Sequence, residues 1–361
     1  MICQQTWERY LLKEILKVFT LFLLSFYFLY TVIDYSMHVQ EIIKSQKISF
    51  GNLSLYYSML FSKRCDLLLP LALLIASLKV LLSLNRKNEL LAFQAGGIKL
   101  KRLLRPFFLM AAVCTLINYV NFEWVVPRSL TFIERFEKHN FRSKKSQKKK
   151  GEGVHMLPLE DGSRLIYQDY DAEAKELFDV YWLHSTDKFF HMKKLAIGTD
   201  IPTGLFVDVL LRTEKGLLEK VDSYENYPFY RLKLDFDLKN YIRKPMESRS
   251  ITDLIKLQRS QKPFWKEKKD KIRANLYSKL LLPWLSLFVV IGIAPFAVRF
   301  SRNLPAFLLF SLAIFGYIAL FMILEASTIL GESRVVAPFA AIFTVPILFL
   351  LYFGRKFLKL G

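Results

Sequence analysis

Six long apolar windows constrain the fold of this chain more than any other feature of its sequence. They cover residues 18–36, 67–84, 106–122, 280–298, 303–324 and 335–354. Apolar runs of about 20 residues are long enough to cross a bilayer as helices. Because lipid offers no partner to a backbone amide or carbonyl, isolated spans of this kind must be helical. The sequence therefore predicts six transmembrane helices, three on each side of a long insertion.

A buried soluble core is the alternative interpretation, since 53% of the 361 residues are hydrophobic. Three of the windows, however, crowd into residues 280–354 with almost no polar residues between them. The charged residues Asp34 and Lys79 lie toward the ends of their windows, where a side chain reaches the membrane interface. The pattern favours a membrane protein. No small-x-small cleavage site follows the first window, so it is not expected to be a cleaved signal peptide.

The net charge of +20 fits nucleic-acid binding, contact with anionic lipid, or cytoplasmic loops that obey the positive-inside rule. With the N-terminus inside, the short outer segments hold Lys44, Lys47, Lys63, Arg64 and Arg334. The short inner segments hold many more basic residues: Arg9, Lys13, Lys17, Arg86, Lys87, Lys99, Lys101, Arg102, Arg105, Arg299, Arg302, Arg355, Lys356 and Lys359. This bias predicts both termini in the cytoplasm and the insertion outside. The basic stretch 128–150 opposes the assignment, but long translocated domains escape the rule.

The insertion, residues 125–275, contains no apolar window. Its basic first part, 128–150, is expected to be a helix extension or a mobile arm. Short runs rich in β-branched and aromatic residues follow, separated by turn signals, at 164–170, 176–184, 204–213 and 229–237. This spacing predicts a small antiparallel sandwich or open roll. The expected domains are 1–127, 128–275 and 276–361.

Alternation within two of these runs predicts which side chains face the interior of the β domain. The inward sets are Phe178, Val180 and Trp182 in one run, and Leu232, Leu234 and Phe236 in the other. Further along, Ser250 or Thr252 is expected to cap a short helix that returns the chain to the membrane. An LLLP tetrapeptide occurs in the second and fourth windows and should place Pro70 and Pro283 in the first turn of a span.

The chain lacks the motifs of an enzyme or of a nucleotide-binding protein. It has no G-x-x-x-x-G-K-[ST], no G-x-S-x-G and no H-E-x-x-H. Its histidines are scattered without metal-ligand spacing, and Cys3, Cys65 and Cys114 form no CxxC pair. No catalytic residue, cofactor or metal is therefore expected, and no nucleic-acid module is recognisable.

The segment NRKNELLAFQAGGIKLKRLLRP, residues 85–106, joins the second and third windows on the predicted cytoplasmic side. Asn85 is expected to cap a helix over 86–95. Gly96 and Gly97 are expected to end that helix in a left-handed turn. The segment thus predicts a short helix at the membrane surface.

Glu89 is the only acid among the six bases of this segment, and Leu90, Leu91 and Phe93 supply apolar contacts. Such a helix either inserts into a groove on a partner protein or rests on lipid headgroups. The residues by themselves leave both interpretations open.

This segment resembles the second span and coupling segment of the lipopolysaccharide export permeases, the LptF/LptG family. Their pattern, L-x-R-x-x-E-L-x-A-x-x-A-G, is matched by Leu84, Arg86, Glu89, Leu90, Ala92, Ala95 and Gly96. Supporting matches lie at 9–19, 118–127, 250–255 and 276–298. The resemblance therefore covers both membrane halves and is loose in the predicted β domain.

The resemblance implies a non-catalytic permease subunit in a bacterial inner membrane, paired with a second, paralogous permease above a cytoplasmic ATPase dimer. Its coupling residues would be Arg86, Glu89, Leu90, Phe93, Gly96 and Gly97. Lipopolysaccharide would enter the spans laterally and pass through a periplasmic, jelly-roll-like β domain to a periplasmic bridge protein. The candidate contacts for lipid phosphates are Lys44, Lys47, Lys63 and Arg64, near the outer face.

Two other functions are compatible with parts of the pattern. A membrane-anchored scaffold would use the β domain to dock envelope-assembly proteins without moving lipid, and no glycolipid would crosslink to it. A lipid-modifying enzyme would need a polar catalytic cluster, such as Asp34, His38 and Lys63 around one pocket. Within the resembling family, the run YTVIDYSMHVQEIIKS after the first window favours the LptG type.

Overall fold

The structure is a computed structural model of the whole chain and divides into two compact units. It describes residues 5–44, 50–140, 155–159, 161–171, 174–198, 201–213, 216–230, 232, 246–260, 265–266, 268–298 and 306–360. The helical unit consists of Met1–Phe141, Ser248–Ile255 and Asp270–Gly361, and the β unit of Arg142–Glu247 and Lys256–Lys269. The expected domain 128–275 therefore encloses the β unit together with some residues of the helical unit.

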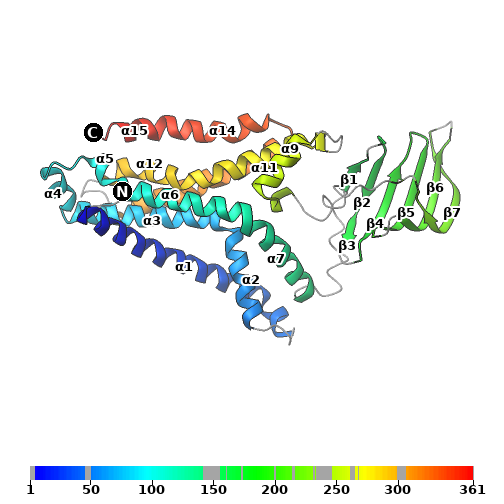
Figure 1. Cartoon of the computed structure of the whole chain (residues 1–361), viewed down its shortest axis with the longest axis horizontal. Coiled ribbons are helices and arrows are strands. Elements are labelled where there is room, and N and C mark those ends of the chain that lie inside the picture. Colours follow the sequence, from blue (N-terminus) through cyan, green and yellow to red (C-terminus); the bar gives the residue numbers. More distant parts are fainter. Residues whose placement is uncertain are drawn as a thin grey trace. The chain divides into compact units, whose positions relative to one another are not determined.

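Six helical stretches in the described chain are long and apolar enough to cross a membrane, which confirms the fold class that the six windows predict. They are Thr6–Val39, Cys65–Arg86, Arg105–Glu137, Lys269–Val298, Ala306–Glu332 and Pro338–Leu358. Three of them precede the β unit in the sequence and three follow it, and Figure 1 shows several of them side by side in the helical unit. The chain is therefore a multi-pass membrane protein.

The elements of the first three spans are α1 (Thr6–Lys44), α2 (Phe50–Lys63), α3 (Cys65–Arg86), α4 (Glu89–Ala95), α5 (Leu100–Leu103), α6 (Arg105–Val120), the π-helix η1 (Asn121–Val125) and α7 (Val126–Asn140). Those of the return and the last three spans are the 3₁₀ turn η3 (Met246–Ser248), α9 (Ile251–Arg259), α11 (Lys269–Leu281), the 3₁₀ turn η4 (Leu282–Trp284), α12 (Leu285–Val298), α13 (Ala306–Glu332), α14 (Pro338–Phe349), the π-helix η5 (Leu350–Gly354) and α15 (Arg355–Leu358).

The second and fourth spans form the centre of the helical unit. Within their most apolar windows 78% and 72% of residues are buried, against 17% in the first and fifth spans and 11% in the sixth. Leu73 and Leu78 of α3 are fully buried, and α3 packs closely on α12. Helices α1, α13 and α14 therefore present most of their apolar surface to lipid or to another membrane protein.

The third span continues as one helix well beyond its apolar window. It passes from α6 through η1 into α7, which ends at Asn140, so the helix extension expected for the start of 128–150 is confirmed. Residues 141–150 lie outside the described part. Helix α7 packs on α2, where the rings of Tyr56 and Phe136 stack at 4.6 Å beside the buried Ile133.

The two prolines do not lie in the first turn of a span, as was expected. Helix α3 begins at Cys65, which places Pro70 in the second turn, and Pro283 lies in the 3₁₀ turn between α11 and α12. Both helices begin in polar residues that precede the apolar windows. Pro283 prevents regular helical hydrogen bonding at the 3₁₀ turn. Side chains of α6 bind carbonyls there: the Tyr119 hydroxyl donates to Leu280 O at 2.7 Å, and the Thr115 hydroxyl donates to Pro283 O at 3.1 Å.

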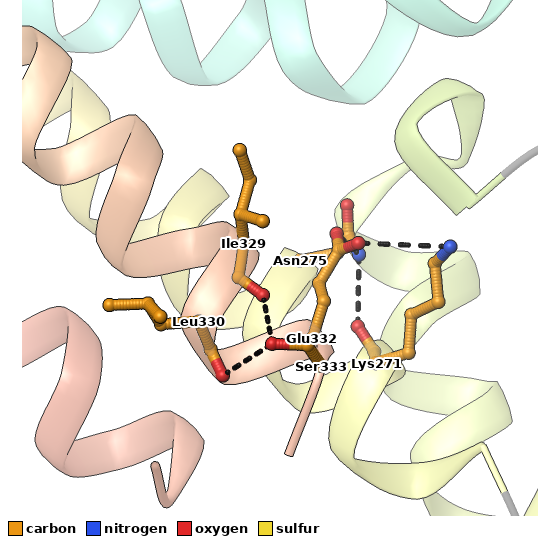
Figure 2. Close-up of polar contacts among 6 residues, drawn as sticks. All are labelled: Lys271, Asn275, Ile329, Leu330, Glu332 and Ser333. Atoms are coloured by element: carbon orange, nitrogen blue, oxygen red, sulfur yellow. Dashed lines mark hydrogen bonds and ion pairs between the residues drawn. The ribbon is translucent and has the colours of Figure 1, made fainter. Parts of the chain in front are cut away.

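A polar clasp joins α11 to the end of α13, and Figure 2 shows its central residues. The Glu332 carboxylate accepts a hydrogen bond from Asn275 Nδ2 at 2.6 Å and lies 3.7 Å from Lys271 Nζ. Next to it, Arg334 Nε pairs with Asp270 Oδ2 at 3.3 Å. Asn275 is buried, so its amide depends on these partners. The clasp fixes the end of the fifth span against the beginning of the fourth.

The described strands of the β unit form one open antiparallel sheet, in the order β1-β2-β4-β5-β6-β7, with β3 paired to β4. They are β1 (His155–Pro158), β2 (Arg164–Tyr167), β3 (Asp169–Asp171), β4 (Glu176–Leu183), β5 (Lys188–Ala196), β6 (Thr203–Arg212) and β7 (Leu218–Pro228). The strands expected at 164–170, 176–184 and 204–213 are confirmed. Most of the run 229–237, with Leu234 and Phe236, lies outside the described residues, while β1, β5 and β7 were not predicted.

A crease across the sheet changes which side chains face its core. In β4, Val180 and Trp182 are buried as expected, but the next inward residue is Leu177 instead of Phe178. Asp179 in β4 and Phe206 in β6 have positive φ values of 49° and 53°. Each drops out of the pairing at the same row of the sheet, so the register on either side is kept. The prediction for Phe178 was wrong because Asp179, with its positive φ, leaves the extended conformation on which strict alternation depends.

An aromatic cluster closes the core of the β unit. Trp182 stacks on Phe190 at 5.1 Å and meets Phe229 edge-on at 5.4 Å. The Trp182 indole donates a hydrogen bond to Ser163 Oγ at 3.0 Å, which satisfies its only donor. Leu232 is buried, as expected.

Candidate coupling site

The surface helix between the second and third spans begins later than the sequence predicts. Helix α4 begins at Glu89, whereas the expected helix began at Arg86, because α3 continues through Arg86. The chain then turns at Asn88, which has a left-handed φ of 58°. Asparagine tolerates this conformation better than most residues. Only seven residues, Glu89–Ala95, therefore make up the surface helix.

Asn85 does not cap α4, as had been expected, but contacts the fourth span. Its Nδ2 lies 3.3 Å from Val298 O and 3.4 Å from Ala297 O, the last carbonyls of α12. Carbonyls at the end of a helix have no partner within the helix, so a side-chain donor stabilises them. Asn85 thereby ties the end of the second span to the end of the fourth, directly before α4.

The end of α4 is the left-handed stop that the two glycines predict. Gly97 has a φ of +79°, and its N–H donates to Gln94 O at 2.9 Å. The N–H of Ile98 donates to Phe93 O at 3.0 Å. These two bonds form a Schellman motif, in which a residue with positive φ closes the helix. A side chain at Gly97 would be strained by this backbone conformation.

The inner face of α4 anchors the helix to the membrane spans. Leu90 is only 5% exposed and belongs to the main hydrophobic core. Phe93 packs against the same core, and its ring lies 6.0 Å from the ring of Trp7 in α1. Leu90 and Phe93 therefore point into the protein and connect α4 to α1 and α3.

The outer face of α4 is apolar and open. Leu91 is 61% exposed, and Ala92, Gln94 and Ala95 beside it are exposed as well. At its edge, Glu89 Oε1 lies 3.8 Å from Lys87 Nζ, with one third of the glutamate side chain accessible. We call these residues, Glu89, Leu91, Ala92, Gln94 and Ala95, the α4 outer face. An exposed leucine beside small side chains suits contact with a protein groove.

Trp7 is the residue of this site that sequence reasoning missed. It lies at the start of α1, and the buried residues Leu11, Ile15 and Val18 follow it at helical spacing. This spacing, which continues into the first apolar window, is the signal that could have identified Trp7 as a core contact.

A second polar cluster holds the chain where it returns from the β unit. Ser250 Oγ accepts a hydrogen bond from Asp253 N at 3.1 Å, so the expected cap of the return helix α9 is confirmed. The backbone N–H and the hydroxyl of Thr252 both donate to the carboxylate of Glu123 in η1. Buried Lys279 of α11 donates to Arg249 O. The cluster links the return helix to the third and fourth spans.

The structure describes two of the four candidate lipid contacts. Lys63 ends α2, Arg64 follows it, and both side chains are exposed. Within the described ranges, neither forms an ion pair. Lys47 and the side chain of Lys44 lie outside the described part.

Together, six apolar helices, an inserted β unit and an anchored surface helix define a class of protein, the multi-pass transport permeases with a soluble insertion. The family model for the lipopolysaccharide export system permease LptF/LptG matches residues 9–358. The chain belongs to this family, and it is a transporter permease subunit in lipopolysaccharide export. A comparison with curated protein sequences gave no match.

Proposed function

We propose that this chain is one permease subunit of an ABC transporter that extracts lipopolysaccharide from the bacterial inner membrane. A separate cytoplasmic ATPase dimer docks on the α4 outer face and supplies the energy through ATP hydrolysis. A second, paralogous permease completes the pathway, and the periplasmic β unit passes the lipid to a bridge protein.

The observation that carries this proposal is the division of α4 into two faces. Leu90 and Phe93 join the helix to the spans, while Leu91 is exposed beside Glu89. A helix that only rested on lipid would need no such connection to the core of the spans. This division supports mechanical coupling. An ATPase that binds Leu91 and moves α4 would also displace Leu90 and Phe93.

Two further features support the other parts of the proposal. The exposed apolar faces of α1, α13 and α14 suit a second permease and a laterally entering lipid. The bias of basic residues supports cytoplasmic termini and a periplasmic β unit. Lys63 and Arg64 are then candidate contacts for the phosphates of lipopolysaccharide, as are Lys44 and Lys47.

The test is to copurify the chain with its paralogous permease and the candidate ATPase, and to measure lipid-stimulated ATP hydrolysis. Leu91→Glu should weaken ATPase binding at least about tenfold, since a charge replaces the exposed apolar side chain that the ATPase would bury. Reversing the charge in Glu89→Lys should also weaken it, because a carboxylate contact with a partner Arg or Lys is lost. Leu91→Met is the matched control and should retain binding.

Unchanged assembly and ATP hydrolysis in both Leu91→Glu and Glu89→Lys would show that α4 does not couple the two proteins. If the ATPase binds and hydrolyses ATP but no glycolipid crosslinks to the spans or to the β unit, a scaffold without lipid transport replaces the proposal.

A further inference from the structure

A cavity of about 340 Å³ lies directly after α4, and its lining is strongly basic. It is formed by Gly97, Lys99, Lys101, Arg102 and Arg105. Its volume is near the lower end of the range for small-molecule sites, about 300–1,000 Å³. The cavity is open to its surroundings, and its four basic side chains are exposed, so a headgroup could enter it from outside.

The cations of this cavity have no anionic partner in the part of the chain that the structure describes. None of the four basic side chains forms an ion pair there, and Lys101 Nζ instead donates to Leu358 O at 3.0 Å. The nearby carboxylate of Glu89 pairs with Lys87. Like charges that converge on one cavity repel each other, and an anion inside it removes that cost. The basic lining of the cavity therefore favours an anionic ligand.

The position of the cavity identifies the kind of anion. Arg105 begins the third membrane span, and Phe107 and Phe108 follow it into the apolar region. A ring contact of 5.5 Å between Phe108 and Phe357 places α15, with its further basic residues, beside the same region. Figure 1 shows α4, α5 and α15 at the same end of the helical unit. The cavity thus lies where a span enters the bilayer, at the level of lipid headgroups.

We propose that this cavity binds the phosphate of an anionic glycerophospholipid. The guanidinium groups of Arg102 and Arg105 bind the phosphate oxygens through paired N–H donors, and Lys99 adds a point charge. The acyl chains lie along the apolar residues of α6. The inference requires only that α6 crosses the membrane, so it stands apart from the coupling function of α4.

The test measures how much phosphatidylglycerol the purified full chain retains, by native mass spectrometry after transfer from nanodiscs of phosphatidylcholine and phosphatidylglycerol. Each charge removed from the cavity should weaken binding by about fivefold, which is the contribution of one basic residue that contacts an anionic lipid. Arg102→Gln and Arg105→Gln should each lower retention to this extent, and the double variant further. Arg102→Lys should keep part of the binding. Lys13→Gln removes an exposed charge outside the cavity and is the matched control.

Because all these side chains are exposed, the variants should fold normally, and their thermal unfolding without phosphatidylglycerol should match that of the parent. Loss of retention in Arg102→Gln and Arg105→Gln but not in Lys13→Gln supports the site. Equal loss in all three, or loss in none, overturns it. If inorganic phosphate protects the parent against thermal unfolding and phosphatidylglycerol does not, the lipid assignment is overturned in favour of a soluble phosphate.

Discussion

At Gly204, in the sheet of the β unit, the core leaves no space for a side chain. An added Cβ would lie 2.7 Å from Phe229 Cε2 and 2.7 Å from Val207 Cγ2. Phe229 is buried and meets both Trp182 and Phe190 edge-on at 5.4 Å, so a shift of its ring would disturb the aromatic cluster. Gly204 has no positive φ, so its backbone conformation does not require a glycine. The close packing of Phe229 and Val207 does.

We expect Gly204→Ala to lower the free energy of unfolding of the β unit by about 1–3 kcal/mol, as overpacking of a core does. Urea unfolding of the intact protein, monitored through the protease resistance of the β unit, measures this free energy. Gly198→Ala is the control in the same unit, since the Cβ there would meet only the side chain of Lys175. Equal stability of the two variants would contradict the packing argument.

Neighbouring residues in α4 show how much of the site the residue pattern could predict. Leu90 and Leu91 look equivalent in the sequence, and both were expected to supply apolar contacts. The structure buries Leu90 and exposes Leu91, because the turn at Asn88 sets the rotation of the helix. A seven-residue helix is too short for its periodicity to identify the buried face.

At the scale of whole elements, local sequence predicted the helices and several strands well. The length of the apolar windows sufficed for the spans, and the choice of Ser250 or Thr252 as cap located the start of α9, where the structure shows Ser250 as the cap. Local sequence failed to predict features in which one element depends on another. The end of α3, for example, is stabilised through Asn85 by carbonyls of α12 that lie more than 200 residues later.

The clasp between α11 and α13 leads to a prediction about stability. Glu332→Ala should lower the free energy of unfolding of the helical unit by about 1–3 kcal/mol, because buried Asn275 loses a charged hydrogen-bond partner. Lys271→Gln, which removes only a partly exposed ion pair, should cost less than about 1 kcal/mol. Thermal unfolding in detergent compares the two, and a larger loss for Lys271→Gln would disprove the assigned roles.

At the scale of the whole molecule, the proposed topology places α4 and the exposed surface of the β unit on opposite sides of the membrane. Tyr230 in the β unit is 73% exposed, and Lys359, which follows α15 on the same predicted side as α4, is exposed as well. Cys65 and Cys114 are buried and should react little with an added thiol reagent. A cysteine at either position therefore reports its side of the membrane once Cys3 is replaced by serine.

In cells whose outer membrane has been permeabilised, a thiol reagent that cannot cross the inner membrane should label Tyr230→Cys. It should label Lys359→Cys only after the inner membrane is opened. The reverse pattern would place the β unit in the cytosol and end the proposal that it receives lipopolysaccharide in the periplasm.

The sequence by itself determined the number of spans, several of the inserted strands and the stop of α4 at Gly97. These features depend on local physics: apolar length against bilayer thickness, and a backbone conformation that favours glycine. Only the tertiary structure decided that Leu91 faces outward, that the sheet creases at Asp179, and that four cations line one cavity. These features depend on how the helices pack, how the strands pair and how the turns between α4 and α6 bring the four cations together, and no hydrophobic period in the sequence predicts them.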